Sequence, residues 1–299
     1  MKIFDLHCDT FCELFDRKLT LNDNSLAINY AELSCFDTAV QTFSVFLHPK
    51  YNDSAYRYAE VLNCGKKALK EANIKICTNR HALENDGIKA LLSGEGGVPN
   101  FSPNFVEKLF LDGIRTVSLT WNYDNPIAGG CNGDSGLTAL GEDIIREINR
   151  CKMAVDLSHL NQKSFFEVIE RADSAVATHT GVFSIVEHPR NLTDEQLKLI
   201  KEKDGVVGLT VYPEFIGQDP FEGFYYSVEH CLDLGLEDNL SLGSDFDGAE
   251  MYENLSKASH LKALNKYLLS KNIAQPIIDK IFFENSYKFY NRVLTNGTL

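Results

Sequence analysis

The chain has 299 residues, of which 44% are hydrophobic and 24% are charged. This composition is typical of a globular protein and excludes a collagen-like, low-complexity or disordered chain. Lysine and arginine number 29 against 42 aspartate and glutamate residues, so the formal net charge is −13. Because an acidic surface repels phosphate backbones and anionic lipids, we expect neither nucleic acid nor a membrane among its partners.

Signals for membrane insertion or export are not evident in the sequence. No run of eighteen or more apolar residues occurs, and residues 1–9 do not have the apolar centre of a signal peptide. The eight cysteines are scattered and form no Cys-x-x-Cys pair. This pattern is typical of small buried side chains in a reducing compartment. We therefore expect a cytoplasmic protein.

Short apolar runs rich in β-branched residues alternate with helical patterns along the chain. The runs predict strands over residues 3–6, 39–47, 89–93, 116–120, 153–157, 175–178, 206–211 and 240–243. Helix-like spacing of apolar residues predicts helices over residues 55–71, 137–151, 163–172, 194–203, 257–270 and 275–294. The fourth helix begins with Thr193 and Gln196, which form a capping-box pattern.

Eight strands, most of them followed by a helix, indicate parallel pairing through right-handed crossovers. Nearly continuous apolar strands also suit a parallel sheet that helices cover. We therefore predict an α/β fold in which residues 1–299 form one domain, a (β/α)8 TIM-type barrel. The alternative is an open, doubly wound sheet. Such a sheet usually carries a glycine-rich phosphate turn after an early strand, and this chain has none.

Five polar residues follow the predicted strands, at the end where such barrels carry their chemistry. His7 and Asp9 close the first strand, and side-chain alternation places them on one side of it. Glu95 lies between glycines after the third strand, and His159 and His179 end the fifth and sixth. Each residue alone has a structural explanation, such as a hydrogen bond at a strand end or a solvated turn.

Taken together, the three imidazoles and two carboxylates form a donor set that suits Zn²⁺. One catalytic zinc typically takes three protein ligands, whereas two ions sharing a carboxylate would use all five. Glu95 is the expected bridge, because its strand lies between the two other ligand groups in chain order. Asp245 emerges between small residues after the last strand, which suits proton transfer or a position facing a metal.

With these motifs the chain resembles the membrane dipeptidases, also called renal-type dipeptidases, which are binuclear zinc peptidases on a (β/α)8 barrel. The resemblance runs nearly end to end. Its motifs are Asp5-x-His7-x-Asp9, Ser93-Gly94-Glu95-Gly96-Gly97, Leu119-Thr120-Trp121-Asn122, Val155-Asp156-Leu157-Ser158-His159, His179, Arg190-Asn191, Tyr212 and Gly243-Ser244-Asp245-Phe246-Asp247-Gly248.

The resemblance implies a role for each residue of the site. His7 and Asp9 would bind one zinc, His159 and His179 the other, and Glu95 would bridge them. Asp245 matches the family's acid/base aspartate. Arg190, in the loop after the sixth strand, matches the arginine that holds the terminal carboxylate of the substrate.

Three further residues are expected to bind substrate: Trp121, Asn122 and Tyr212. The family places a histidine beside the scissile carbonyl where this chain has Trp121. An indole N–H donates one hydrogen bond but carries no positive charge. Stabilisation of the oxyanion would then depend on Asn122 or on a zinc ion.

The resulting prediction is a metallopeptidase that cleaves dipeptide-like substrates with a free C-terminal carboxylate, through a hydroxide bridging two zinc ions. Other divalent transition metals would satisfy the same donors. One alternative is a metal-dependent amidohydrolase acting on a carboxylate-bearing lactam or an N-acyl amino acid. Another is a barrel that binds peptides without cleaving them, a hypothesis that only Trp121 favours. The resemblance also makes a homodimer the expected assembly.

Overall fold

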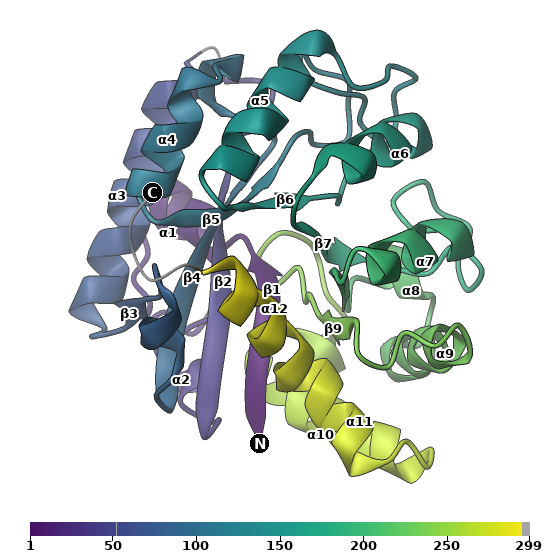
Figure 1. Cartoon of the computed structure of the whole chain (residues 1–299). Helices are drawn as coiled ribbons and strands as arrows, with labels where there is room; N and C mark the ends of the chain where they lie inside the picture. The colour runs from purple at the N-terminus through teal and green to yellow at the C-terminus, as the bar shows by residue number, and fades with distance from the viewer. Residues whose placement is uncertain (52, 295–299) are drawn as a thin grey trace.

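Eight parallel strands close into a barrel in the computed structural model, which describes residues 1–51 and 53–294 (Figure 1). The sheet order is β2-β1-β9-β8-β7-β6-β5-β4-β3, and β2 also pairs with β4, so β3 lies outside the ring. The strands are β1 (Lys2–Cys8), β2 (Thr38–Phe46), β3 (Lys75–Ile76), β4 (Gly87–Glu95), β5 (Ile114–Ser118), β6 (Ala154–Asp156), β7 (Ala175–Thr180), β8 (Val206–Leu209) and β9 (Leu240–Leu242). This ring confirms the predicted (β/α)8 barrel.

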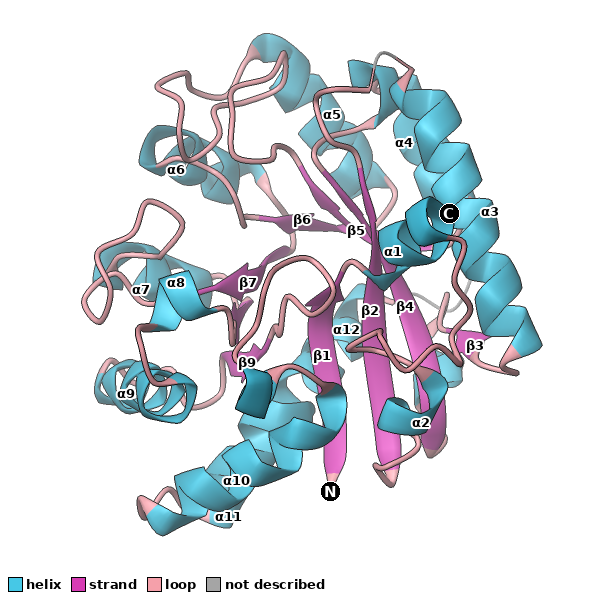
Figure 2. Ribbon diagram, turned by 180° about the vertical axis from the view of Figure 1, so that it is seen from behind, coloured by secondary structure: helices cyan, strands magenta, loops and turns pink. Residues whose placement is uncertain are grey.

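Helices surround the strands on the outside of the barrel (Figure 2). The α-helices are α1 (Thr10–Arg17), α2 (Tyr30–Leu33), α3 (Ser54–Glu71), α4 (Asn104–Leu111), α5 (Ala139–Arg150), α6 (Gln162–Arg171), α7 (Asp194–Glu202), α8 (Pro213–Ile216), α9 (Pro220–Asp233), α10 (Leu261–Ser270), α11 (Gln275–Asp279) and α12 (Asn285–Val293). Short 3₁₀ turns cover Arg80–Leu83, Pro99–Phe101, Glu253–Leu255 and Ala258–His260, and a π-helical turn covers Lys280–Glu284.

The predicted strands and helices are found, with differences in detail. The helix expected over residues 257–270 begins with a 3₁₀ turn, and the one expected over 275–294 is divided by the π-helical turn. The capping box at Thr193 is present. The short β3 and the helices α1, α2, α4, α8 and α9 were not predicted. The sequence does contain a helix-start signal for α9, because Asp219 caps its first turn and Pro220 follows at the first helical position.

Two apolar clusters hold the barrel together. The larger one fills the space between the sheet and the surrounding helices. The smaller one lies where Phe4, Leu91 and Val176 meet α12, which packs on β1, β8 and β9 and crosses in front of the strands in Figure 1. The Phe4 and Tyr290 rings stack with centroids 5.4 Å apart. The last helix therefore seals one end of the barrel and leaves the carboxyl ends of the strands free for a site.

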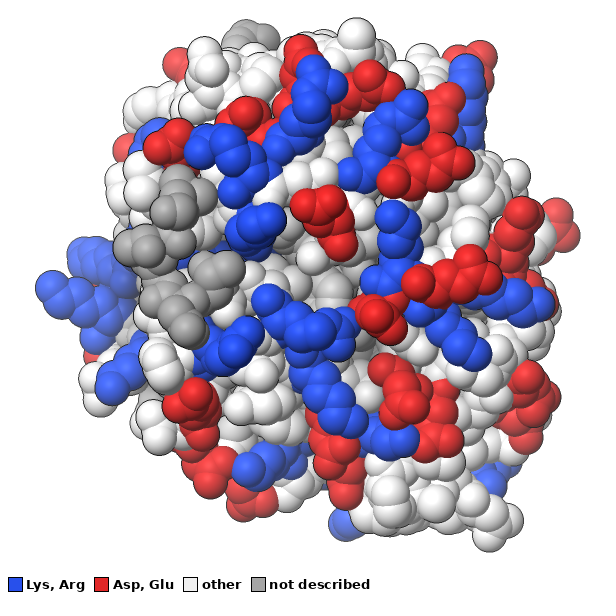
Figure 3. Space-filling view, in the orientation of Figure 1, with Lys and Arg blue, Asp and Glu red and all other residues white. Residues whose placement is uncertain are grey.

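The surface carries charges of both signs, and the cysteines are not paired. On the face in Figure 3, lysine and arginine side chains lie beside aspartate and glutamate side chains. All eight cysteines are free.

Among residues 1–51 and 53–294, no helix has both the length and the apolar character needed to cross a bilayer. Residues 52 and 295–299 of the predicted domain lie outside the described part of the chain.

Candidate metal centre

A cavity of about 350 Å³ opens at the carboxyl ends of the barrel strands. Every site residue predicted from the sequence lines it except His7, which lies directly beneath its wall at 1% exposure. The predicted lining residues are Asp9, Glu95, Trp121, Asn122, His159, His179, Arg190, Tyr212 and Asp245. Residues remote in the sequence are thus brought to one place by the closed ring of parallel strands.

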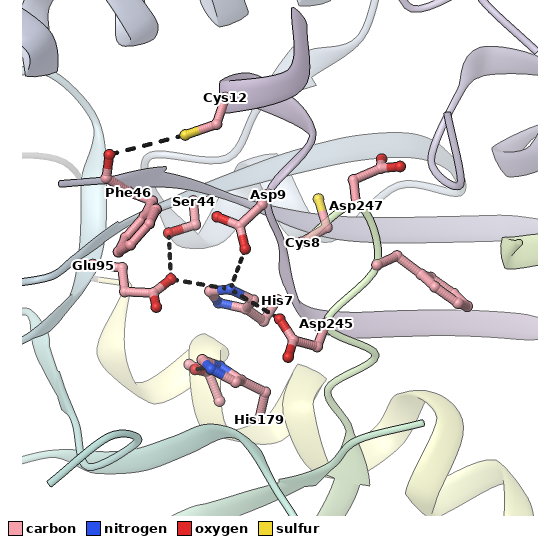
Figure 4. A network of polar contacts seen from close by, with 12 residues as sticks. His7, Cys8, Asp9, Cys12, Ser44, Phe46, Glu95, His179, Asp245 and Asp247 are labelled. Carbon is pink, nitrogen blue, oxygen red and sulfur yellow. Dashed lines mark hydrogen bonds and ion pairs between the residues drawn. The ribbon is translucent and has the colours of Figure 1, made fainter. Parts of the chain in front are cut away.

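Three carboxylates converge on the imidazole of His7 (Figure 4). Its Nε2 atom lies 3.2 Å from Glu95 Oε2, 3.4 Å from Asp9 Oδ2 and 3.8 Å from Asp245 Oδ1. Burial opposes a charge on this ring, but the carboxylates of Glu95 and Asp9 raise the pKa of His7 well above its usual value. So many acceptors around one ring nitrogen indicate a place for positive charge.

A second group of donors meets the other oxygen of Glu95. His159 Nε2 is 2.9 Å from Glu95 Oε1 and 2.9 Å from His179 Nε2. One oxygen of Glu95 therefore faces His7, and the other faces His159. Glu95 thus contacts a histidine of each group, as expected for a bridge, and the His7 and His179 rings also lie close, with centroids 3.9 Å apart.

Hydrogen bonds fix the tautomers of His159 and His179. His159 Nδ1 is 2.7 Å from Asn122 Oδ1, which can only accept, so this ring nitrogen carries the proton. Thr178 Oγ1 donates to Asp156 Oδ2 at 2.5 Å and so accepts from His179 Nδ1 at 2.9 Å. Both rings therefore present an Nε2 lone pair to the cavity.

These lone pairs fit a divalent cation. Two Nε2 lone pairs 2.9 Å apart repel each other unless a cation lies beside them, and in the described chain the buried Asp9 Oδ1 has no hydrogen-bond partner. Burial, reinforced by Arg190, lowers the pKa of His159 to about 4. Burial also lowers the pKa of His179, so both rings stay neutral, the form that binds metal. Imidazole and carboxylate together suit Zn²⁺ and similar ions.

Irregular backbone aims several of these side chains. The register of β1 against β2 shifts between Asp5 and Cys8, and that of β7 against β8 shifts between Ala177 and Thr180. His7 and His179 lie within these two shifts, and bulges of this kind commonly redirect side chains beside active sites. His159 and Asp245 have left-handed backbone, with φ of 70° and 67°. Such strained residues cluster at functional sites.

Two glycines beside the site have no room for a side chain. Gly96 has φ of 86°, and a Cβ there would lie 2.3 Å from the carbonyl oxygen of Leu47. A Cβ on Gly248 would lie 2.3 Å from Asp9 Oδ2 and 2.9 Å from Asp245 Oδ1. Gly248 therefore keeps open the space in which these carboxylates sit.

Asp5 joins the two strands that carry His7 and Asp245. It is fully buried and accepts from the Ser244 hydroxyl at 2.5 Å and from the Ser244 amide at 2.8 Å. The sequence shows Asp5 within its motif, but alternation along a strand does not reveal a partner more than two hundred residues away. Only the structure shows the contact with Ser244 through which Asp5 positions the site.

Asp245 lies where a proton can be exchanged with the cavity. It lines the cavity and sits beside His7. Burial, together with the nearby carboxylates of Asp9 and Glu95, raises the pKa of Asp245 to about 7. A carboxyl group with such a pKa both takes and gives a proton near neutral pH.

Arg190 supplies a buried positive charge at the cavity wall. Arg190 is 5% exposed, its guanidinium packs 5.2 Å from the Phe215 ring, and its Nη2 donates to the carbonyl oxygen of His179 at 3.3 Å. This carbonyl is the single side-chain hydrogen-bond partner of Arg190 in the part of the chain described. A buried guanidinium with so few partners is suited to an anion from outside the protein.

Trp121 and Tyr212 lie on different parts of the cavity wall. The Trp121 ring is 5.5 Å from Phe46 and 6.4 Å from His159. Tyr212 precedes α8 and packs edge-on against Phe215 at 4.8 Å. Burial raises the pKa of Tyr212 to about 12, so its hydroxyl remains a donor at neutral pH.

Comparison with known proteins identifies the family of the chain. The profile of a family described as membrane dipeptidase (peptidase family M19) matches residues 1–297. An uncharacterised protein of the pqqA 5′ region in Klebsiella pneumoniae is 31% identical over 244 residues, which cover 76% of this chain and 87% of that protein. Alignments to dipeptidases of Schizosaccharomyces pombe and Claviceps purpurea cover only 39% and 45% of those longer proteins.

Solved structures of metallopeptidases share the fold. The dipeptidase AC, a metallopeptidase of family M19, superposes with a TM-score of 0.89 at 22% identity, covering 100% of this chain and 99% of that one. A metallopeptidase of Rhodobacter sphaeroides, bound to a phosphinate mimic of the dipeptide L-Ala-D-Ala, gives a TM-score of 0.86 at 23% identity. That superposition covers 98% of this chain and 99% of the other.

Proposed function

The chain belongs to the membrane dipeptidase family, the metallopeptidase family M19, and we propose that it hydrolyses dipeptide-like substrates with a free C-terminal carboxylate. The observation that carries the proposal is the convergence of five side chains suited to metal binding beside a buried arginine that has no carboxylate partner among the described residues. The metal donors support hydrolysis, and the arginine supports a substrate that ends in an anion.

We assign the five donors to two Zn²⁺ ions. His7 and Asp9 would hold one ion, His159 and His179 the other, and Glu95 would give one oxygen to each. The two oxygens of Glu95, which face different histidines, support this assignment. When bound, such a pair of ions lowers the pKa of a shared water and polarises the carbonyl of the peptide bond. Other divalent transition metals would serve the same donors.

Asp245 is the proposed acid/base. As water adds to the peptide carbonyl, Asp245 accepts a proton from it, and then delivers a proton to the departing amine as the C–N bond breaks. Its position beside His7 and its pKa of about 7 support both steps.

Arg190 is the proposed carboxylate clamp. A guanidinium can donate two parallel hydrogen bonds to a carboxylate, which fixes the substrate's direction as well as its position. Holding the substrate in this way presents the amide bond to the donors in a constant geometry, and such orientation lowers the barrier to reaction.

Three other residues are proposed to contact substrate. Trp121 and Tyr212 line the cavity and carry an indole N–H and a hydroxyl as donors. Asn122 also lines it, but its amide oxygen is taken by His159. The amide nitrogen of Asn122 is therefore the group that remains to donate to a substrate.

A substrate panel tests the proposal. The zinc-loaded enzyme should cleave a dipeptide, and cleavage should fall at least tenfold when the C-terminal carboxylate is amidated, because charged hydrogen bonds contribute about 1.5–3 kcal/mol each. N-acyl amino acids and carboxylate-bearing lactams belong in the panel, since Arg190 would hold them equally well. Faster cleavage of either class would replace the dipeptidase assignment. Tight dipeptide binding without cleavage would indicate a non-catalytic barrel.

We also propose that the chain forms one hydrolase domain. The nine strands form one sheet, eight of which close into a single ring, and α12 packs on β1, β8 and β9. A cytoplasmic location and a homodimer remain predictions from the sequence.

A further inference from the structure

We propose that four aromatic side chains at the cavity form a subsite for an apolar or aromatic side chain on the amino-terminal residue of the substrate. These side chains, here called the aromatic wall, are Phe46, His48, Tyr51 and Trp121. The inference rests on the proposed dipeptidase function and adds the class of substrate.

The four rings form a continuous surface. Trp121 lies 5.5 Å from Phe46 and 5.0 Å from His48, measured between ring centroids. His48 in turn lies 5.8 Å from Phe46 and 6.3 Å from Tyr51. All four line the same cavity as the metal-binding residues.

The wall borders the reacting centre directly. Phe46 ends β2 in register with Glu95 on β4, and Figure 4 shows the two side chains next to each other. At the other end of the wall, the Trp121 ring lies 6.4 Å from His159. A substrate carbonyl at the metal centre would therefore have the wall as its neighbour.

His48 contributes an uncharged ring to this wall. The Lys50 amide donates to His48 Nδ1 at 3.0 Å, so that nitrogen carries no proton. Burial, with the charge of Lys50, also lowers the pKa of His48. The wall thus presents aromatic surface at neutral pH rather than a positive charge.

The wall stands across the barrel mouth from the carboxylate clamp. In the closed ring, β2 and β7 are four strands apart in either direction, and Arg190 lies in the loop after β7. An extended dipeptide whose carboxylate binds Arg190 would cross the metal centre and direct its amino-terminal residue towards β2. The aromatic wall occupies that position.

Three of the four charged side chains that line this end of the cavity, Glu13, Asp16 and Arg57, are in ion pairs. Arg57 forms two hydrogen bonds with Asp16, at 2.6 and 2.7 Å, and Glu13 pairs with Arg17 at 2.7 Å. The Lys50 ammonium lies 5.2 Å from the Tyr51 ring. A charged substrate side chain would therefore compete with existing pairs at Glu13, Asp16 and Arg57, whereas an apolar one gains contact with the rings.

Steady-state kinetics on the zinc-loaded enzyme tests the subsite. The substrates are L-Phe-D-Ala, L-Leu-D-Ala, L-Ala-D-Ala, Gly-D-Ala and L-Asp-D-Ala, which differ only in the amino-terminal side chain. We expect kcat/KM for the phenylalanine substrate to exceed that for the glycine substrate at least tenfold. Trp121→Ala should reduce this ratio to below about threefold. Tyr226→Ala is the matched control, because Tyr226 is 44% exposed and outside the cavity lining, and it should keep the wild-type ratio.

Fluorescence gives a second measurement that does not depend on turnover. Trp121 is the only tryptophan of the chain, so its emission reports on the wall. Titration of the zinc-loaded protein with phosphinate dipeptide mimics should show at least tenfold tighter binding of the phenylalanine mimic than of the glycine mimic, with a change in emission. Equal affinities, or tight binding without an emission change, would overturn the subsite.

The two proposals fail in different ways. If dipeptides are cleaved without a preference, or if the preference survives Trp121→Ala, the dipeptidase function stands and the subsite is wrong. If no dipeptide is cleaved, the proposed function is wrong, and the fluorescence titration alone decides whether the wall binds apolar side chains.

Discussion

Replacing Thr178 by valine removes one hydroxyl from beneath the metal centre and preserves the shape of the side chain. That hydroxyl accepts from His179 Nδ1 at 2.9 Å and donates to Asp156 Oδ2 at 2.5 Å. Loss of a hydrogen-bond partner behind a metal-binding histidine typically weakens metal affinity 10–100-fold. We therefore expect zinc to bind Thr178→Val 10–100-fold more weakly, or by about 1.4–2.7 kcal/mol.

Zinc affinity is measured by competition with a chromophoric chelator at constant pH. Thr178→Ser restores the hydroxyl and should recover most of the affinity. Thr116→Val is the matched control, because Thr116 is equally buried and its hydroxyl hydrogen-bonds to Tyr290 at 2.7 Å, where α12 packs on the barrel. Both valine variants should destabilise the metal-free protein by about 1–3 kcal/mol. Only Thr178→Val should lose zinc, and affinity within twofold of wild type would refute the role of Thr178.

Three more substitutions test the site. Gly248→Ala would place a Cβ 2.3 Å from Asp9 Oδ2, so we expect metal analysis to show loss of one of two zinc ions while circular dichroism stays unchanged; full occupancy would contradict this. Asp245→Asn should retain zinc yet lower kcat about 10²–10⁴-fold, the usual contribution of a general acid or base, and near-normal turnover would remove Asp245 from that role. Arg190→Ala should raise KM about 10–100-fold for dipeptides but not for their C-terminal amides, and an equal rise for both would count against the clamp.

The positions of the proposed metal ligands could be predicted because the barrel rule is strong. Parallel strands place their carboxyl ends at one rim, so His7, Glu95, His159 and His179 were expected to meet once each was recognised at a strand end. The hydrophobic pattern marks where each strand ends and therefore which polar residues lie at that end. The structure brings all of them together around one cavity.

The contacts behind these residues could not be predicted in the same way. Strict alternation places Thr178 and His179 on opposite faces of β7, yet the Thr178 hydroxyl lies 2.9 Å from His179 Nδ1. The register shift between Ala177 and Thr180, where both residues lie, leaves no mark in the residue pattern. Asn122 reaches His159 because the loop after β5 folds against the end of β6, a path that depends on tertiary packing. Asn122 was predicted only as a substrate contact, but it also fixes the tautomer of His159, a proposed metal ligand.

Anomalous diffraction at the zinc edge, from crystals of the zinc-loaded protein, tests the central claim most directly. We predict two peaks about 3.5–4 Å apart. One should lie beside His7 and Asp9, the other beside His159 and His179, with an oxygen of Glu95 next to each. A single peak, peaks away from Glu95, or none at all would contradict the two-ion centre on which the proposed hydrolysis depends.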